Sequence, residues 1–512
     1  MKAESHQATQ GEDLSRSSLS ILCCVFVLLT SFFTYFFHYD QPQAPFWDEN
    51  YYITDAERIL NGVFFMQIHP PLGKLLIAAG EAIFDPNESD AQFLETEHAG
   101  EFPQDFSFVG YRFFPALLGW LTVPLFFLCL LLLTRNPLVA TLLSFLIIFD
   151  NALLVHSRGA MLDAPLHFFF VLTCLLFLLL VHTKNRSKIF LWLSGGLGIS
   201  IGLAVATKMN GAILFLFFPA LLWHLRREWK SALATCVLSG SALLIAFMGV
   251  WYVHLSRMEI IRPALRDSGW YTASEEYKEI LQQGAQRSLL AFPIMLRDHL
   301  QYAPFYNQGI PKLDLCKPDE NGSPVFLWPF GVSTINYRWA SAGENTYRYL
   351  YLVPNPAIWF VGLMGILLSA AFLLSPLFGA KRSLYVDRER AFIGTVFLMI
   401  YMGYVATFSM MDRVHFLYSY FPALIISFLL FGIVFSSVRA IGSFHFTEER
   451  KTLVAMFLAC LIFLCFQIYR PFTYYEPITN DAVKNRSILR LWNLHCVGCE
   501  KPSSIVRHQC DA

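Results

Sequence analysis

The sequence has little charge for its length. Of 512 residues, only 15% are Asp, Glu, Lys or Arg, and the formal net charge is +0. Soluble domains carry about 25% charged residues, so this chain lacks the charge to cover a water-facing surface of ordinary polarity. A net charge of zero also gives no indication of a nucleic-acid partner. Hydrophobic residues take the place of charge and make up 55% of the chain, including 49 Phe.

Cysteine says little about function outside the apolar stretches. Seven of the eleven cysteines lie inside those stretches, where Cys behaves as a small hydrophobe. Cys496, Cys499 and Cys510 lie in the C-terminal tail with His495 and His508. A Cys-x-x-Cys pair with nearby His suits zinc, whereas outside the cytoplasm it is more typical of a disulfide or of idle thiols. Both interpretations stay open; no metal site is predicted, and a divalent cation is left open as a cofactor.

Long apolar runs dominate the sequence. A helix of about 20 apolar residues crosses the hydrocarbon core of a bilayer. Eleven runs approach that length: residues 19–38, 113–133, 138–155, 166–182, 189–206, 212–225, 232–253, 357–378, 391–408, 416–438 and 453–469. No small-residue cleavage site follows the first run, which predicts an uncleaved helix rather than a signal peptide. Only residues 207–211 separate the fifth and sixth runs, so a re-entrant hairpin is an alternative there. We predict an all-α integral membrane protein.

The positions of Lys and Arg orient these spans, because cytoplasmic loops carry an excess of both. Alternate loops hold fourteen of them on one side: Arg135, Lys184, Arg186, Lys188, Arg226, Arg227, Lys230, Lys381, Arg382, Arg388, Arg390, Arg439, Arg450 and Lys451. The opposite short loops hold only Arg158, Lys208 and Arg413. The richer side and the N-terminus are therefore predicted to be cytoplasmic, and eleven spans place the C-terminus outside. We expect a multi-pass protein of the plasma (inner) membrane.

This orientation predicts two large outer loops within one membrane domain. The segments are a cytoplasmic tail 1–18, a membrane domain 19–469 with outer loops 39–110 and 254–356, and an outer tail 470–512. A helix is expected from Asp48 to Leu60, and another after Ser274, because Glu275 and Glu276 complete a typical helix start. The stretch from Pro329 to Tyr351, rich in Tyr and Trp, suits the membrane interface.

Two adjacent carboxylates lie early in the first outer loop. Asp48 and Glu49 follow Phe46 and Trp47, and aromatic residues of this kind favour the membrane surface. Taken alone, an acidic pair at a helix start is explained by the helix dipole. At the membrane edge, a carboxylate is also placed to accept a proton from a hydroxyl nucleophile. Asp48 and Glu49 are therefore the candidate catalytic residues.

Basic residues on the same side form the second half of the candidate site. In the first loop, Pro70 and Pro71 stiffen the segment between His69 and Lys74. Four cations lie at outer helix ends: Arg112, Arg158, Lys208 and Arg413. Snorkelling to headgroups explains any one of them, but several on the side of the acidic pair predict a bound anion. A base beside such a cluster suits attack of a hydroxyl on a sugar carbon, with displacement of a lipid-linked phosphate.

At these residues the sequence resembles a known family, the protein O-mannosyltransferases. The likeness begins with Phe46–Glu49 and His69–Lys74. It continues in family order through Tyr111–Phe113, Gly119–Leu125, Asp150–Asn151, Ser157–Arg158, Leu162–Asp163, Thr207–Gly211, Gly331–Tyr337, Asn355–Trp359 and Arg413–Pro422. These motifs extend from the first outer loop to the tenth predicted span.

The resemblance implies an integral-membrane glycosyltransferase of the C-type fold. Its members use polyprenyl-phosphate mannose as donor and Ser or Thr hydroxyls of exported proteins as acceptor, met during translocation or after it, and invert the anomeric carbon. By this analogy Asp48 is the general base, and Glu49 shapes the acceptor site. The residues assigned to the donor phosphate and sugar are His69, Lys74, Arg112, Arg158, Asp163, Lys208 and Arg413. The implied partners are the lipid donor, the protein acceptor and membrane lipids, with no nucleic acid.

Two departures and two alternatives accompany this resemblance. The loop 254–356 is too short for the folded insert of eukaryotic members, which indicates a bacterial-type member, and Ser419–Tyr420 stands where the family often has His-Tyr. One alternative keeps the fold and donor but glycosylates a glycolipid or lipopolysaccharide, as aminoarabinose transferases do. The other is a transporter, which predicts ionisable residues deep inside the spans, whereas most here lie at helix ends.

Overall fold

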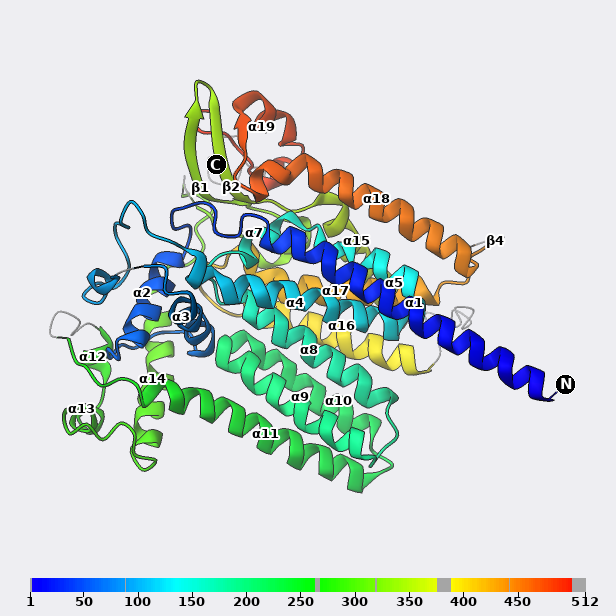
Figure 1. Ribbon diagram of the computed structural model, residues 1–512, viewed down its shortest axis with the longest axis horizontal. Helices are drawn as coiled ribbons and strands as arrows, with labels where there is room; N and C mark the ends of the chain where they lie inside the picture. Colours follow the sequence, from blue (N-terminus) through cyan, green and yellow to red (C-terminus); the bar gives the residue numbers. More distant parts are fainter. Residues whose placement is uncertain are drawn as a thin grey trace.

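The computed structural model describes residues 2–87, 89–262, 268–317, 320–374, 388–441 and 443–499. Within these residues, nine helices are long and apolar enough to cross a membrane, and they run side by side as a bundle (Figure 1). They are α1 (Lys2–Phe36, apolar from Ser17), α4 (Val109–Thr134), α8 (Asp163–His182), α9 (Lys188–Thr207), α11 (Trp229–Leu255), α15 (Pro356–Leu374), α16 (Arg388–Ser409), η6 with α17 (Leu417–Tyr420 and Phe421–Ser437) and α18 (Glu448–Thr473).

The two remaining apolar runs form broken or short helices. The third run is divided into α5 (Pro137–Leu143), α6 (Phe145–Ile148) and α7 (Asn151–Ser157), with a bend of 63° before α7. Asp150 causes the break, because one carboxylate oxygen caps Leu153 N at 2.8 Å and the other accepts from Trp359 Nε1 at 3.0 Å. The sixth run forms η2 (Met209–Leu216) and α10 (Phe217–His224). The prediction of a helical, multi-pass membrane fold is confirmed.

Small residues bring the spans close together. A Cβ on Gly198 of α9 would lie 2.0 Å from the carbonyl oxygen of Ser239 in α11. A Cβ on Gly365 of α15 would lie 2.2 Å from the carbonyl oxygen of Ser427 in α17. Such small-residue contacts are how membrane helices approach each other, since lipid offers no hydrophobic force to join them.

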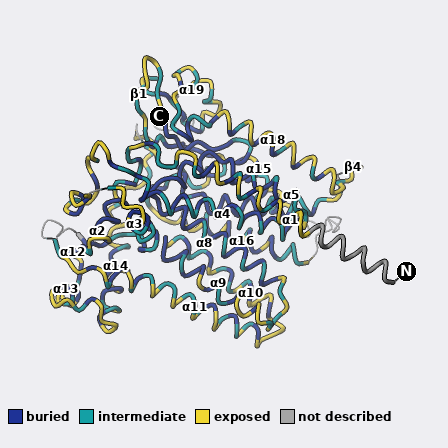
Figure 2. Tube along the Cα trace, viewed as in Figure 1, coloured by how far each residue is buried: buried dark blue, intermediate teal, exposed yellow. Residues whose placement is uncertain are grey.

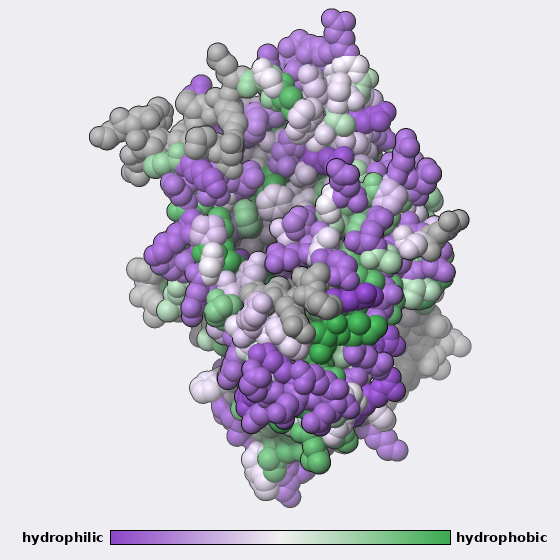
Figure 3. Space-filling model, turned by 90° about the vertical axis from the view of Figure 1, so that its left-hand side faces the viewer, coloured by the Kyte–Doolittle hydropathy of each residue, from purple (hydrophilic) through white to green (hydrophobic). Residues whose placement is uncertain are grey.

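Both large loops lie at the same end of the bundle, and α1 begins at the other end (Figure 1). The loop elements are α2 (Glu49–Leu60), α3 (Leu72–Phe84), η1 (Ala91–Phe93), α12 (Ser268–Thr272), α13 (Glu275–Gln282), α14 (Phe292–Asn307) and η4 (Val325–Phe330). Both expected loop helices are present, and the Ser274 hydroxyl caps Tyr277 N at 3.2 Å. This end, here called the outer end, is mostly hydrophilic where Figure 3 views it.

A small sheet also lies at the outer end, which an all-α prediction did not include. Strands β1 (Ile335–Gly343), β2 (Thr346–Leu352) and β5 (Pro477–Thr479) pair antiparallel in the order β1-β2-β5. The aromatic stretch expected at the membrane interface therefore forms a hairpin. Beside it lie α19 (Asn480–Arg486), η7 (Arg490–Trp492) and a disulfide between Cys496 and Cys499, whereas Cys510 is outside the described residues. A second hairpin, β3 (Ala440–Ile441) and β4 (Phe444–His445), lies at the opposite end.

Burial separates the lipid-facing helices from the inner ones (Figure 2). The apolar window of α11 is only 11% buried and that of α1 is 28% buried, so both helices direct apolar side chains outward. By contrast, 72% of the window of α8 and 83% of that of η6 with α17 are buried. The inner helices carry several of the polar residues described next.

Candidate active site

Asp48 begins α2 with its side chain uncommitted. It occupies the N-cap position, yet its carboxylate makes no capping hydrogen bond. The side chain is half-buried. Burial raises the pKa of Asp48 to about 6; the Lys208 ammonium opposes this rise and the Asp163 carboxylate adds to it. A carboxylate with this pKa is ionised at neutral pH and basic enough to accept a proton from a hydroxyl in a transition state.

Glu49, the adjacent residue, is held by four hydrogen bonds. Its carboxylate accepts from Arg112 Nε and Nη2, both at 2.8 Å. It also accepts from the backbone N–H of Phe46 at 3.0 Å and of Ala160 at 2.8 Å. The side chain of Glu49 is fully buried. Glu49 therefore ties the turn before α2 to α4 and to the segment after α7, and its oxygens do not face open space.

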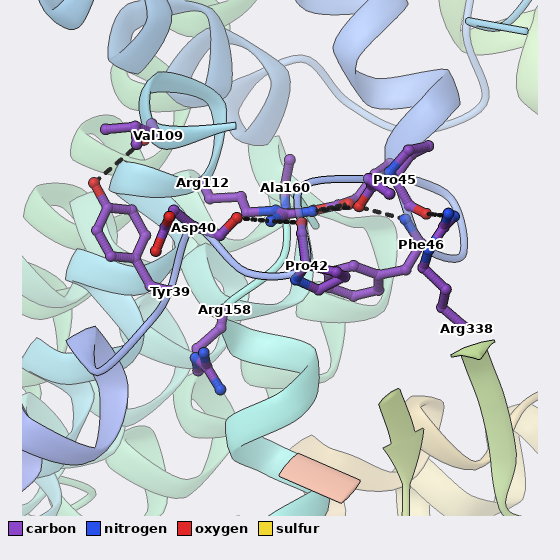
Figure 4. A network of polar contacts seen from close by, with 12 residues as sticks. Tyr39, Asp40, Pro42, Pro45, Phe46, Val109, Arg112, Arg158, Ala160 and Arg338 are labelled. Atoms are coloured by element: carbon purple, nitrogen blue, oxygen red, sulfur yellow. Dashed lines mark hydrogen bonds and ion pairs between the residues drawn. The ribbon is translucent and has the colours of Figure 1, made fainter. Parts of the chain in front are cut away.

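Arg112 completes this network from α4. Its other N–H groups donate to the carbonyl oxygens of Asp40 at 2.7 Å, Pro42 at 2.8 Å and Ala44 at 2.9 Å, as Figure 4 shows for part of this set. A guanidinium has five N–H donors, and all five are used within the protein. The sequence assigned Arg112 to the donor phosphate. In the structure it has no donor left for a phosphate and holds the backbone that precedes Asp48.

A second polar network crosses from the spans to the sheet. Lys208, which follows α9, donates to both carboxylate oxygens of Asp163 at 2.8 Å. The Nε2 atom of His156 lies 2.9 Å from Asp163 Oδ2, and its Nδ1 atom lies 2.7 Å from the Tyr337 hydroxyl. This network joins α7, α8 and β1. The sequence predicted Asp163 and Lys208, but not His156 or Tyr337.

Aromatic rings connect this network to the turn that carries Asp48. The Tyr418 ring stacks on His156 at 4.6 Å between centroids, and Lys208 Nζ lies 5.6 Å from the Tyr418 ring. Trp47, directly before Asp48, contacts Tyr337 at 5.2 Å and Tyr418 at 6.1 Å. Asp48 and the Lys208–Asp163 pair therefore belong to one site.

A cavity of about 470 Å³ opens beside this site. Its polar lining includes His69, Lys208, Asn210, Arg413 and His415. Burial, with the nearby charges of Lys208, Lys74 and Arg413, holds the pKa of His69 well below its usual range. The Asp163 carboxylate acts in the opposite direction, but the imidazole is neutral. One acidic residue, Asp412, also lines the cavity. Two cations, Lys208 and Arg413, line this cavity together with neutral His69. Such cations favour an anionic ligand, and the role predicted for these three residues at a donor phosphate stays a prediction.

Lys74 and Arg158 do not line this cavity. Lys74 is buried, 3.4 Å from Asp55 Oδ2. Arg158 donates to the carbonyl oxygens of Thr473, at 3.0 Å, and of His38, and its guanidinium lies 4.6 Å from the Tyr474 ring. Figure 4 shows the Arg158 side chain pointing away from Arg112. The predicted contact of Lys74 and Arg158 with a donor phosphate therefore has no support in this geometry.

A second cavity of about 340 Å³ adjoins the first, and both are lined by Ile68, His69, Met209, Ala303, Pro304 and Asn307. Its other lining residues include Trp251 of α11 and Leu300 of α14. It is the less polar of the two. Among the described residues, no three His, Cys, Asp or Glu side chains form a set that would hold a metal ion.

Comparison with known proteins identifies relatives over most of the chain. A family model described as dolichyl-phosphate-mannose-protein mannosyltransferase matches residues 25–260. A second, described as the C-terminal four-transmembrane region of protein O-mannosyltransferase, matches residues 302–492. Together the two models span most of the sequence, and they include the turn at Asp48, the Lys208 segment and the Arg413 segment.

Individual relatives are distant but extensive. A polyprenol-phosphate-mannose–protein mannosyltransferase of Mycobacterium tuberculosis is 25% identical over 503 residues, which cover 88% of this chain and 85% of that protein. A dolichyl-phosphate-mannose–protein mannosyltransferase 1 of Candida albicans is 28% identical over 247 residues, and the chain spans only 27% of its length. In structure, a chain of the S. cerevisiae protein O-mannosyltransferase Pmt1-Pmt2 complex bound to the sugar donor matches with a TM-score of 0.76. The match is 16% identical and covers 93% of this chain and 92% of that one.

Proposed function

Because the chain belongs to the protein O-mannosyltransferase family, we propose that it transfers mannose from a polyprenyl-phosphate-mannose donor to a Ser or Thr hydroxyl of a protein. The observation that carries this proposal is the position of Asp48. Its carboxylate, uncommitted and with a pKa of about 6, lies within the electrostatic influence of Lys208. Lys208 lines a cavity together with Arg413, and these two cations suit a lipid-linked phosphate. The names of the relatives favour a protein acceptor over a glycolipid.

In the proposed reaction, Asp48 accepts the proton of the acceptor hydroxyl. The hydroxyl oxygen then attacks the anomeric carbon of mannose, and the bond from that carbon to the phosphate oxygen breaks. Polyprenyl phosphate leaves with the bonding electrons. Lys208 and Arg413 stabilise its growing negative charge, and neutral His69 offers an N–H donor. A single displacement of this kind inverts the anomeric carbon.

The Glu49–Arg112 pair acts on Asp48 through the backbone. Its bonds fix the segment from Asp40 to Phe46 and the first residue of α2. Catalytic groups must be held within about 0.5 Å of their working geometry. We therefore assign Glu49 and Arg112 as positioning residues, and the donor phosphate to Lys208, Arg413 and His69.

The membrane orientation belongs to the same proposal. The excess of Lys and Arg on one side favours a cytoplasmic N-terminus. The outer end, with both large loops, the site and the described segment 477–499, then faces away from the cytoplasm across the plasma (inner) membrane. The donor would be met in the outer leaflet, and the acceptor would be an exported protein, during translocation or after it.

A direct assay tests the proposal. The purified full chain in detergent is given synthetic polyprenyl-phosphate mannose and a Ser/Thr-rich peptide, and products are identified by mass spectrometry. A gain of one hexose on a hydroxyl residue, with the anomeric configuration of the donor inverted in the product, supports it. Transfer only to lipid, or only from a nucleotide sugar, would overturn it.

A further inference from the structure

Two hydrogen-bond acceptors at the cavity have no partner. Among the described residues, no donor reaches Oδ1 of Asn210 or Nε2 of His415, and both atoms are buried. Both side chains line the same cavity as Lys208 and Arg413. Leaving a buried acceptor unpaired is costly, and most buried polar groups in proteins are paired. Two such atoms around one cavity point to a ligand that donates hydrogen bonds.

The orientation of Asn210 is fixed by its neighbours. The Tyr404 hydroxyl donates to the carbonyl oxygen of Ser419 at 2.7 Å. Its oxygen is therefore free to accept from the Asn210 amide nitrogen, which lies 3.0 Å away. The amide NH₂ group is thus turned toward Tyr404, and the other end of the amide is an acceptor.

His415 presents an acceptor for a similar reason. The pKa of His415 is influenced by a hydrogen bond from its ring to the Met411 backbone, and we assign this bond to Nδ1 because Nε2 has no partner. Burial and the nearby Arg413 lower the pKa of His415 to about 4, so the ring is neutral at pH 7. In a neutral imidazole, one nitrogen donates and the other accepts. The Phe408 ring contacts His415, at 5.0 Å between centroids, and also Tyr404, the partner of Asn210, at 4.8 Å.

We propose that Asn210 and His415 recognise the transferred sugar, each accepting a hydrogen bond from one hydroxyl of a neutral hexosyl group. The inference rests on the proposed function, because it places the sugar beside a phosphate held by Lys208 and Arg413. Two hydrogen-bond acceptors suit a sugar whose hydroxyl groups donate. They disfavour a sugar that carries a carboxylate, because its oxygens and the acceptors Oδ1 and Nε2 would have no hydrogen to form a bond between them. The two residues thus select among lipid-linked sugars.

The test uses donors that each lack one hydroxyl. We would measure kcat/KM and donor Kd for polyprenyl-phosphate mannose and its 2-, 3-, 4- and 6-deoxy analogues, with wild type, Asn210→Ala and His415→Phe. With the mannose donor, kcat/KM and donor affinity of each variant are expected to fall by about tenfold, which corresponds to the loss of one hydrogen bond. Each should show no further loss with the one deoxy donor that lacks its partner hydroxyl. Tyr404→Phe removes the group that orients Asn210. It should lower kcat/KM for the mannose donor by less than Asn210→Ala does, and it should show no further loss with the same deoxy donor.

Two results would overturn this inference. One is a wild type that does not distinguish the deoxy donors. The other is a variant that weakens all five donors by the same factor, as a purely structural role predicts. The outcome is separable from the proposed function. If wild type binds the mannose donor but modifies no protein, the proposed function fails, and the donor Kd values still decide the roles of Asn210 and His415.

Discussion

Asp48 and Glu49 are adjacent carboxylates with opposite surroundings. Glu49 is fully buried and accepts four hydrogen bonds, two of them from Arg112. Asp48 is half-buried and makes no capping bond, and only more distant charges act on it. The first turn of α2 directs one side chain into a fixed network and leaves the other available. In the proposed mechanism the two adjacent acidic residues therefore have different roles: Glu49 holds the site in position, and Asp48 accepts the proton.

The largest effect is expected from Asp48→Asn. The amide keeps the shape of the side chain but cannot take a proton, so transfer should fall by about 100-fold or more, as for the loss of a positioned base. Because Asp48 makes no capping bond, the melting temperature and donor Kd should stay near those of wild type. Asp105→Asn, in an exposed part of the same loop, is the matched control and should retain activity.

The next largest effect is expected from a change in the hydrogen-bond network around Glu49. Arg112→Met leaves the buried Glu49 charge without its partner, which is expected to cost about 3–5 kcal/mol of folding free energy. Arg112→Lys should recover only part of this, because an ammonium lacks the bidentate geometry. Thermal or chemical unfolding in detergent measures the difference. A stable Arg112→Met protein whose only defect is a raised donor KM would show that Arg112 acts on the phosphate instead.

A smaller effect, on donor binding, should distinguish the cations that line the cavity from those that do not. Arg413→Ala is expected to weaken donor binding by about tenfold, since a charged hydrogen bond contributes about 1.5–3 kcal/mol, partly offset by solvent because Arg413 is only half-buried. Lys74→Met should leave donor Kd unchanged and lower stability, because Lys74 pairs with Asp55 away from the cavity. Donor titration with each variant measures both. Equal weakening by the two variants would contradict the assignment.

Much of this arrangement was predictable from the sequence, because it depends on local patterns. Apolar length predicted the spans, and aromatic anchors with adjacent acids predicted the Asp48 turn. The role of Arg112 was not predictable. Its five acceptors come from residues 40–49, more than sixty positions away in the sequence. Residue type alone cannot tell whether an arginine binds a phosphate or a carboxylate such as that of Glu49. His156 was missed for a similar reason, since its partners Asp163 and Tyr337 meet only when α8 and β1 are brought together.

The pH dependence of transfer tests the central claim, that Asp48 is the base, most directly. A base works when it is ionised, and the pKa of Asp48 is about 6. Single-turnover transfer should therefore rise with pH through about 6 and level off above it. Lys208 lowers this pKa, so Lys208→Met should move the rise to higher pH, whatever it does to the maximal rate. A rise that stays in place in Lys208→Met, or a flat profile from pH 5 to 8 in wild type, would contradict the account.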